Sequence, residues 1–135
     1  MRLMVYRPKV LRSLDPVCIA LEILGDRWTL LIIRDLMVHD RHSFRELLEG
    51  GEGISTNVLS DRLRRLEWHG LVGLRIGPGG DSRRIEYHLT QRGIDLAPCL
   101  VAMIRWATLY EETSLPEKPF LKMRVNPDGY VRDLR

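Results

Sequence analysis

The sequence predicts a mainly helical α+β fold that contains one small β-hairpin. Apolar residues recur at helical spacing through most of residues 15–112. Two short segments of alternating apolar and polar residues flank a strong turn cluster, Gly77–Asp81. The chain has 135 residues, of which 44% are hydrophobic and 29% charged. That length and composition are typical of a single globular domain.

Composition limits the compartment and the partners of the protein. Its net charge of +3 is compatible with nucleic-acid binding but does not require it. The two cysteines, Cys18 and Cys99, lie in apolar helical contexts without metal-ligand spacing, so we expect buried, reduced thiols. No apolar run approaches the length of a membrane span, and no signal-peptide core is present. We therefore expect a cytoplasmic protein without membrane contacts.

The N-terminal half contains two expected helices behind a basic arm. Residues 1–14 carry four basic side chains and no acidic one. Asp15 and Pro16 are a helix-start signal, and the apolar residues 17–24 should form a helix that Gly25 ends. Asp26 should cap a second helix over residues 27–38.

Two further helices, joined by glycines, are typical of a helix-turn-helix. Ser43 should cap a short helix over residues 44–49, which the following glycines end. Ser55 should cap the next helix, and Gly70 occupies the position of a left-handed C-terminal cap. On this helix, residues 55–69, three leucines fall on one side and predict its core-facing stripe; they are Leu59, Leu63 and Leu66.

The opposite face of the helix over residues 55–69 has the chemistry needed to read a DNA groove. Asparagine pairs with adenine, arginine pairs with guanine, and serine or threonine bonds phosphates or either base. An ordinary solvent-exposed face would also be polar, so this helix alone leaves both interpretations open. The candidate side chains are Ser55, Thr56, Asn57, Ser60 and Arg64.

A hairpin follows this helix directly and predicts the wing of a winged helix-turn-helix. Residues 72–76 and 84–89 alternate as two strands on either side of the turn cluster. Arg75, Arg83 and Arg84 flank the tip, where they can reach backbone phosphates or a minor groove. The alternative is that they are solvated charges that protect a strand edge.

The C-terminal part provides an excess of apolar surface. Thr90 should cap a long helix over about residues 91–112, with Pro98 either kinking it or delaying its regular part. Its apolar side chains cover more of its surface than one small core requires, which indicates a partner, most simply a second copy. Residues 113–135 form a basic extension that is either a small hairpin or a mobile tail.

The ordered set of motifs resembles the HxlR family of bacterial winged helix-turn-helix transcriptional regulators. This resemblance covers about two-thirds of the chain and implies a homodimer, built by the first and last helices, on operator DNA of approximate two-fold symmetry. It also implies a recognition helix at residues 55–69 and a wing at 72–89. The motifs are LGDRWTLLIIR (24–34), FREL (44–47), GISTNVLSDRL (53–63), RLEWHGLV (65–72) and EYHLTQRG (86–93).

The sequence departs from the family pattern at two positions. Redox-sensing members carry a cysteine before the proline of the first helix, where this chain has Asp15, and a carboxylate cannot be reversibly oxidised. Cys18, about one turn later, is then either a redox sensor or a structural thiol. The family also usually has an arginine where this chain has Ser43. Arg45, or Arg41 and His42, could replace its phosphate contact.

Other functions have weaker support in the sequence. Asp35, His39 and His42 have the spacing of a weak metal site, but no fourth ligand or catalytic partner accompanies them, so we expect no enzyme and no cofactor. A winged helix kept only as a protein-interaction scaffold would lack the polar recognition face seen here. A small effector could bind between the long helices of a dimer beside Trp28, Trp106 and Tyr110, although such residues also build cores.

These observations combine into one hypothesis, a homodimeric regulator that binds double-stranded DNA sequence-specifically. Two copies of the helix over residues 55–69 would enter successive major grooves about 34 Å apart. Arg64 and Asn57 are expected at base edges, and Ser55, Thr56 and Ser60 at bases or phosphates. The wings over residues 72–89 would bind the adjacent backbone or minor groove.

Overall fold

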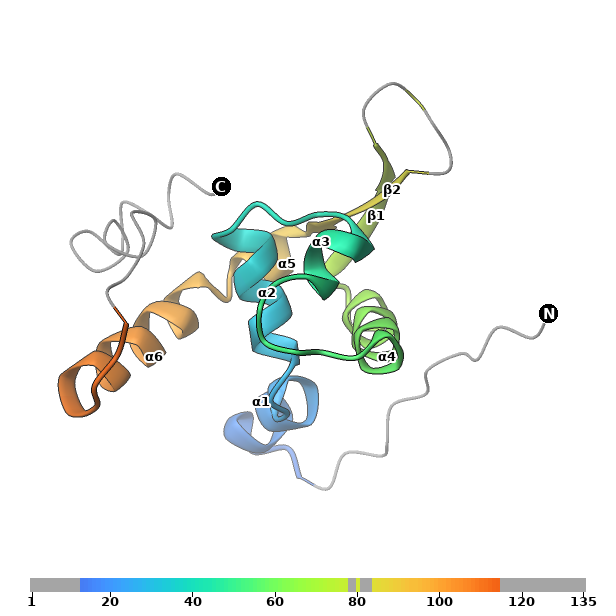
Figure 1. Cartoon of the computed structure of the whole chain (residues 1–135). Helices are drawn as coiled ribbons and strands as arrows, with labels where there is room; N and C mark the ends of the chain where they lie inside the picture. Colours follow the sequence, from blue (N-terminus) through green and yellow to red (C-terminus); the bar gives the residue numbers. More distant parts are fainter. Residues whose placement is uncertain (1–12, 78–79, 81–83, 115–135) are drawn as a thin grey trace.

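The computed structural model describes residues 13–77, 80 and 84–114, and within them a two-stranded hairpin projects from one edge of a group of helices (Figure 1). The elements in chain order are α1 (Pro16–Leu24), α2 (Thr29–Met37), α3 (Phe44–Leu48), α4 (Thr56–Trp68), β1 (Val72–Ile76), β2 (Ile85–Leu89), α5 (Gln91–Ile94) and α6 (Ala97–Tyr110).

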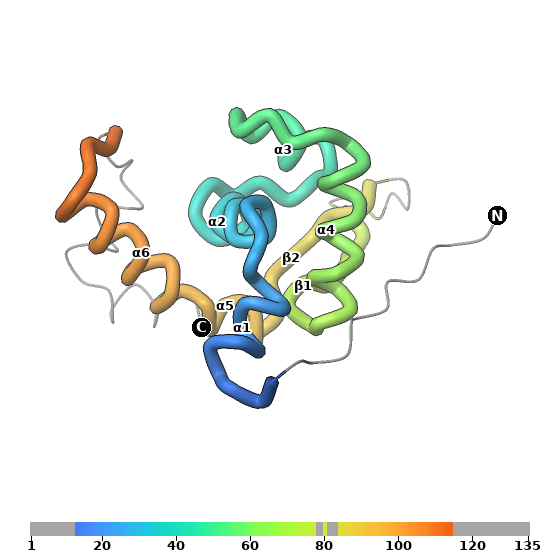
Figure 2. Tube along the Cα trace, turned by 90° about the horizontal axis from the view of Figure 1, so that it is seen from below, coloured from blue at the N-terminus to red at the C-terminus, as the bar shows by residue number. Residues whose placement is uncertain are grey.

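Helix α2 lies at the centre and is packed on several sides. It contacts β2 and α6, while α4 contacts α3 and β1. Figure 2 shows α2 between α6 on one side and α4 on the other. Ile33 is completely buried, and the predicted leucines of α4, Leu59, Leu63 and Leu66, are at most 2% exposed. The leucine stripe of residues 55–69 is therefore confirmed as the side that attaches α4 to the core.

The predicted helix starts are confirmed where a short polar side chain caps the first turn. The Ser43 and Ser55 hydroxyls accept hydrogen bonds from Glu46 N and Val58 N, and Thr90 Oγ1 accepts one from Gly93 N. Asp26 caps a non-helical turn, so α2 begins at Thr29, two residues later than expected.

The predicted hairpin is confirmed: the two strands pair antiparallel, with Val72 opposite Leu89 and Ile76 opposite Ile85. The loop before α3 extends this sheet, because His42 O accepts a hydrogen bond from Tyr87 N at 2.7 Å. Ser43 and Glu86 form an isolated bridge there. The hairpin is thus attached to the helix-turn-helix by backbone bonds, a contact that the sequence did not predict.

The expected single helix over residues 91–112 is wrong, because the chain forms α5 and α6 separated by Asp95 and Leu96. Pro98 is the physical reason: it has no N–H for Ile94 O, and its ring would clash with that carbonyl in a continuous helix. In α6 Pro98 falls in the first turn, where a missing N–H costs nothing. Of the two effects expected of Pro98, a kink or a later start of the regular helix, the later start is confirmed.

Both cysteines are exposed, so the expectation of buried thiols is wrong. The sequence pattern of α1 is apolar, yet no residue of α1 is buried in the single chain. Cys18 lies in the first turn of α1, and Cys18 N donates to the capping carboxylate of Asp15 at 3.0 Å. No helix in the described part of the chain is long and apolar enough to cross a membrane. The interpretations of residues 1–12 and 115–135 lie outside the described residues.

Candidate nucleic-acid interface

The loop before α4 fixes where the predicted recognition helix begins. Gly53 has a φ of +76°, a left-handed conformation that glycine adopts without strain. Glu52 holds this loop against α2, with its carboxylate 3.3 Å from Arg34 Nη1 and 3.9 Å from Arg27 Nη2. The Ser55 hydroxyl then accepts a hydrogen bond of 3.2 Å from Val58 N and starts the helix. The start of α4 is therefore fixed by the ion pairs of Glu52 in the preceding loop and by the Ser55 cap.

The outer face of α4 presents polar groups that the described chain does not use. Thr56 and Asn57 are exposed, and Ser60 and Arg64 are half-buried. Within the described residues, no hydrogen bond or ion pair links the side chains of these four to other groups. Unpaired donors and acceptors in one row along a helix are available to bases and phosphates. The sequence-predicted residues are thus brought together on a single face.

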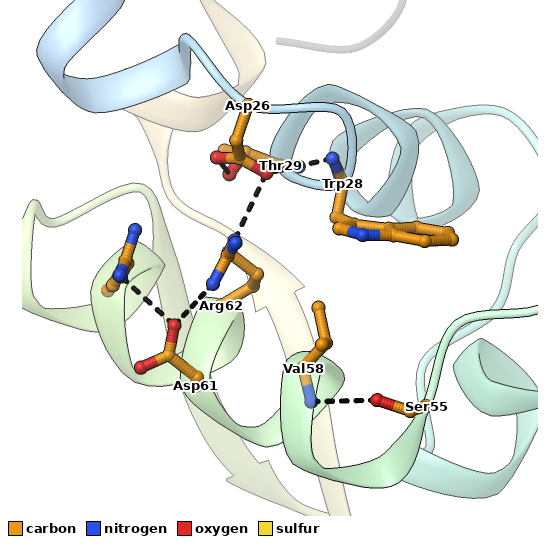
Figure 3. Close-up of polar contacts among 8 residues, drawn as sticks. Asp26, Trp28, Thr29, Ser55, Val58, Asp61 and Arg62 are labelled. Carbon is orange, nitrogen blue, oxygen red and sulfur yellow. Dashed lines mark hydrogen bonds and ion pairs between the residues drawn. The ribbon is translucent and has the colours of Figure 1, made fainter.

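Three other charged residues of α4, Asp61, Arg62 and Arg65, form ion pairs with one another and with the turn before α2. Asp61 accepts from Arg62 Nη1 and lies 3.0 Å from Arg65 Nε. Arg62 also donates from Nε to Asp26 at 3.1 Å, which joins α4 to the turn before α2 (Figure 3). Sequence reasoning missed this connection, although Arg62 stands three residues after Leu59 on the leucine stripe. An arginine at such a position requires an acidic partner beside the core.

Asp26 collects hydrogen bonds from three residues. Besides Arg62, it accepts bonds from Trp28 N at 2.8 Å, from Thr29 N at 3.1 Å and from the Thr29 hydroxyl. Partial burial alone would raise the pKa of Asp26, but the bonds from Thr29, Trp28 and Arg62 outweigh it and lower the pKa below its ordinary value of 3.8. Asp26 is therefore ionised at neutral pH and balances the charge of Arg62.

The C-terminal end of α4 is fixed by its predicted glycine cap. Gly70 has a φ of +70°, Gly70 N donates to Glu67 O, and Leu71 N donates to Leu66 O at 2.9 Å. These two bonds are those of a Schellman motif. Burial and the nearby charges of Arg92 and Arg65 lower the pKa of His69, so its ring is neutral at pH 7.

Ser43 is the N-cap of α3. Its hydroxyl accepts from Glu46 N, while the Glu46 carboxylate accepts from Ser43 N, and both distances are 3.1 Å. This capping box leaves the Ser43 hydroxyl hydrogen available to a phosphate. Arg45 is highly exposed and forms an exposed ion pair of 3.1 Å with Glu49.

The wing carries part of the predicted cationic set. Arg75 pairs with Glu86 across the two strands at 3.5 Å and remains half-exposed. Arg84 is exposed just before β2, which begins one residue later than predicted, and Arg84 O accepts from Gly77 N. Arg83 lies outside the described residues.

The residues of the weak metal-site interpretation are engaged with other protein groups. Asp35 is buried and accepts from Arg34 and Arg41, the latter at 3.0 Å. The two ring nitrogens of His42 lie 3.0 Å from Tyr87 O and 2.6 Å from Asp40 Oδ1. No group of three metal-ligating side chains occurs in the part of the chain that the structure describes.

The aromatic residues proposed for an effector lie apart. Trp28 lines a small hollow formed by residues of α2, of α3 and of the loop between α3 and α4, and no α6 residue contributes to this hollow. Trp106 and Tyr110 lie exposed on α6 with ring centroids 5.9 Å apart. The single chain therefore does not bring these three residues together in that hollow.

A short helix, a capped second helix and a hairpin joined to both define the class of protein: a winged helix-turn-helix. The comparisons with known proteins give the same class, because the HxlR-like helix-turn-helix family matches residues 23–115. The chain belongs to this family, and its relatives are named transcriptional regulators, which implies DNA binding.

Relatives of known sequence and structure agree with this assignment. An HTH-type transcriptional regulator of Mycobacterium tuberculosis is 39% identical over 116 residues, covering 86% of this chain and 70% of the relative. The crystal structure of PA1607, a putative transcription factor, is 32% identical with a TM-score of 0.68, over 79% of this chain and 77% of the other. The reduced form of the regulator YodB from Bacillus subtilis is 31% identical with a TM-score of 0.60, over 76% and 100%.

Proposed function

We propose that the protein is a homodimeric transcriptional regulator that binds double-stranded DNA sequence-specifically through α4. The observation that carries this proposal is the row of unpaired polar groups on the outer face of α4. The inner face of the same helix is buried, so the helix is attached firmly while its reading groups stay available.

The side chains divide into base-reading and backbone-binding groups. Arg64 and Asn57 carry the donors and acceptors that recognise guanine and adenine edges in the major groove. Ser55, Thr56 and Ser60 lie near Asn57 and Arg64 at the start and on the outer face of α4, and their hydroxyls can bind bases or phosphates. The groups proposed for the sugar–phosphate backbone are Ser43, Arg45, Arg75, Arg83 and Arg84.

Two apolar helices support the homodimer. In α1, Val17 is 65% and Leu21 60% exposed, and in α6, Trp106 is 63% and Leu109 72% exposed. Large apolar side chains grouped on helices at two edges of a small domain favour burial against a second copy. A two-fold dimer would place its α4 helices in successive major grooves, about 34 Å apart, with each wing beside the adjacent backbone or minor groove.

Selection of duplexes from a random library tests the DNA-binding part of this proposal. We expect the purified full chain to enrich a pseudo-palindrome whose half-sites are centred about 10 base pairs apart. Enrichment of a single half-site would contradict the dimeric arrangement. Failure to enrich any duplex would favour the alternative, a winged-helix scaffold that binds proteins and not DNA.

Sedimentation equilibrium tests the dimer independently of DNA. We expect twice the mass of the chain at micromolar concentration, because a second copy would bury the apolar side chains exposed on α1 and α6. A protein that stays monomeric at that concentration would contradict the dimer and leave the DNA-binding proposal to the selection experiment.

We include a small-molecule effector in the proposal, bound where α1 and α6 of a dimer meet. The adjacent rings of Trp106 and Tyr110 are the aromatic groups that such a site would use. Tryptophan fluorescence of the dimer, titrated with a panel of aromatic compounds, should change for a binder. The Trp106→Phe variant should abolish that change if the site lies on α6.

A further inference from the structure

We propose that Asp26 is a positioning residue for DNA discrimination, because through Arg62 it sets the rotation of α4 about the helix axis. This inference rests on the proposed function. Asp26 does not itself belong to the reading face: it lies before α2, 36 residues from Arg62 in the sequence. Figure 3 shows the Asp26 carboxylate pointing toward Arg62 across the space between the α2 turn and α4.

The Asp26 carboxylate is itself held rigidly. It accepts bonds from Trp28 N and Thr29 N, which close the turn before α2, and from the hydroxyl of Thr29. Thr29 is 2% exposed, so the donor that fixes the second carboxylate oxygen is part of the core. A charged group with several directional bonds to buried donors keeps one position.

Arg62 links α4 to this fixed carboxylate. Its side chain is 18% exposed and lies between two carboxylates, with Nε bonded to Asp26 and Nη1 bonded to Asp61. The planar guanidinium uses separate donors for the two acids, so both bonds constrain its orientation. Asp61 also forms an ion pair with Arg65, one turn later, which continues the network along α4.

The leucine stripe cannot set this rotation alone. Apolar contacts are non-directional, and a helix can turn somewhat about its axis while its leucines stay buried. With a helix radius of about 5 Å including side chains, a turn of about 20° moves a side-chain tip by about 2 Å. That displacement is more than a hydrogen bond between Arg64 or Asn57 and a base edge tolerates. The Asp26–Arg62 pair supplies the missing directional constraint.

The experiment compares Arg62→Lys and Asp26→Asn with the wild-type full chain. Lysine keeps the positive charge but loses the fork that reaches both acids. Asparagine keeps the oxygen that accepts from Trp28 N and Thr29 N, but it removes the negative charge that pairs with Arg62. Kd is measured for the duplex enriched by the wild type and for a shuffled duplex of equal composition. Val101→Ala, a core truncation in α6, provides a matched loss of stability outside the network.

We expect each network variant to lower the ratio of the two affinities about ten-fold, the cost of one mispaired base contact. Affinity for the shuffled duplex should stay within about two-fold, because the phosphate-binding groups are unchanged. The double variant should lose no more discrimination than the more affected of the two single variants, because both substitutions break the same connection. Val101→Ala should keep the wild-type ratio.

The inference is overturned if folded Arg62→Lys and Asp26→Asn both keep the wild-type ratio, or if Val101→Ala lowers it equally. If Arg62→Lys does not fold, Asp26→Asn alone decides between these outcomes, because its turn retains both backbone bonds. Failure of the proposed function is a different result: the wild type itself would then show no preference for any duplex.

Discussion

Helices α4 and α6 have nearly the same length, 13 and 14 residues, but opposite surfaces. Helix α4 buries a leucine at each turn, from Leu59 to Leu66, and leaves polar groups outside. Helix α6 buries only Ala97, Leu100 and Val101 near its start and leaves Met103, Trp106, Leu109 and Tyr110 exposed. Figure 1 shows α6 extending away from the body while α4 lies against it.

The difference shows which partner each helix can use. Helix α4 has its apolar side satisfied by its own chain, so what remains available to a partner is hydrogen bonding and charge. Most of α6 has no apolar cover in the single chain, so what remains available is hydrophobic burial. Under the proposed function, α4 would bind DNA and α6 would pack against a second copy of the chain.

Truncating the buried stripe of α4 should have the largest effect on the chain itself. Leu63→Ala removes a side chain that is 2% exposed, and we expect a loss of about 2–5 kcal/mol in the free energy of unfolding. Urea denaturation measures this loss. Leu109→Ala, at a position 72% exposed on α6, should change the stability of the monomer by less than about 0.5 kcal/mol. Equal losses would contradict the contrast between the helices.

A charge on the exposed face of α6 should break the dimer and spare the fold. Trp106→Glu should weaken self-association by about 2–4 kcal/mol, because buried tryptophans carry much of the energy of an interface. Sedimentation equilibrium gives the dissociation constant. Trp68→Glu is the matched control, because Trp68 is also half-exposed but lies at the end of α4. A dimer unchanged by Trp106→Glu would remove α6 from the interface.

Removing Arg64 should affect DNA recognition and leave association unchanged. Arg64→Ala should cost about 1–3 kcal/mol on the preferred duplex and relax specificity at one base position. Fluorescence anisotropy with single-base variants of that duplex measures both effects. Arg105→Ala removes the same charge from the exposed side of α6 and should leave the base preference intact. A uniform loss on all sequences would make Arg64 a phosphate contact.

The two roles assigned to Ser55 can be separated by substitution. Ser55→Ala removes the cap on Val58 N and should destabilise the protein by about 0.5–2 kcal/mol. Ser55→Asp retains a capping oxygen and should keep the stability, but it adds a negative charge where DNA is expected and should weaken binding. Thermal unfolding and anisotropy together make the comparison. Normal DNA binding by Ser55→Asp would place this end of α4 away from DNA.

The smallest expected effect is that the free energy of unfolding depends on pH through Asp26. Because the pKa of Asp26 is lowered in the folded protein, the unfolded chain binds the proton first, and Asp26 stabilises the fold above its unfolded value. This contribution is lost as the pH falls from about 4 through the lower native pKa. The stability difference between wild type and Asp26→Asn should therefore shrink as the pH falls from 5 to 2. A difference independent of pH would contradict this assignment.

Local signals in the sequence predicted much of the fold. Ser43, Ser55 and Gly70 act within one or two helical turns, so the sequence spacing alone determines their bonds. The two strands likewise follow from alternating residues on either side of a turn cluster.

Two other features of the structure depend on residues distant in the sequence or on what covers a helix. The partner of Arg62 is Asp26, 36 residues earlier, and no local pattern identifies it. The apolar pattern around Cys18 predicts a helix but not whether another element covers it, and in the single chain none buries it. For the DNA contacts, the sequence predicted which side chains share the outer face of α4.

The ion pairs of α4 also determine how this helix responds to salt. Helix α4 carries three arginines, Arg62, Arg64 and Arg65. Arg62 and Arg65 are already paired with Asp26 and Asp61. Binding DNA through α4 would release about one condensed counterion, since only Arg64 is unpaired among the described arginines of this helix. Most of the ionic-strength dependence must then come from other cations, and α4 would keep its base preference in concentrated salt.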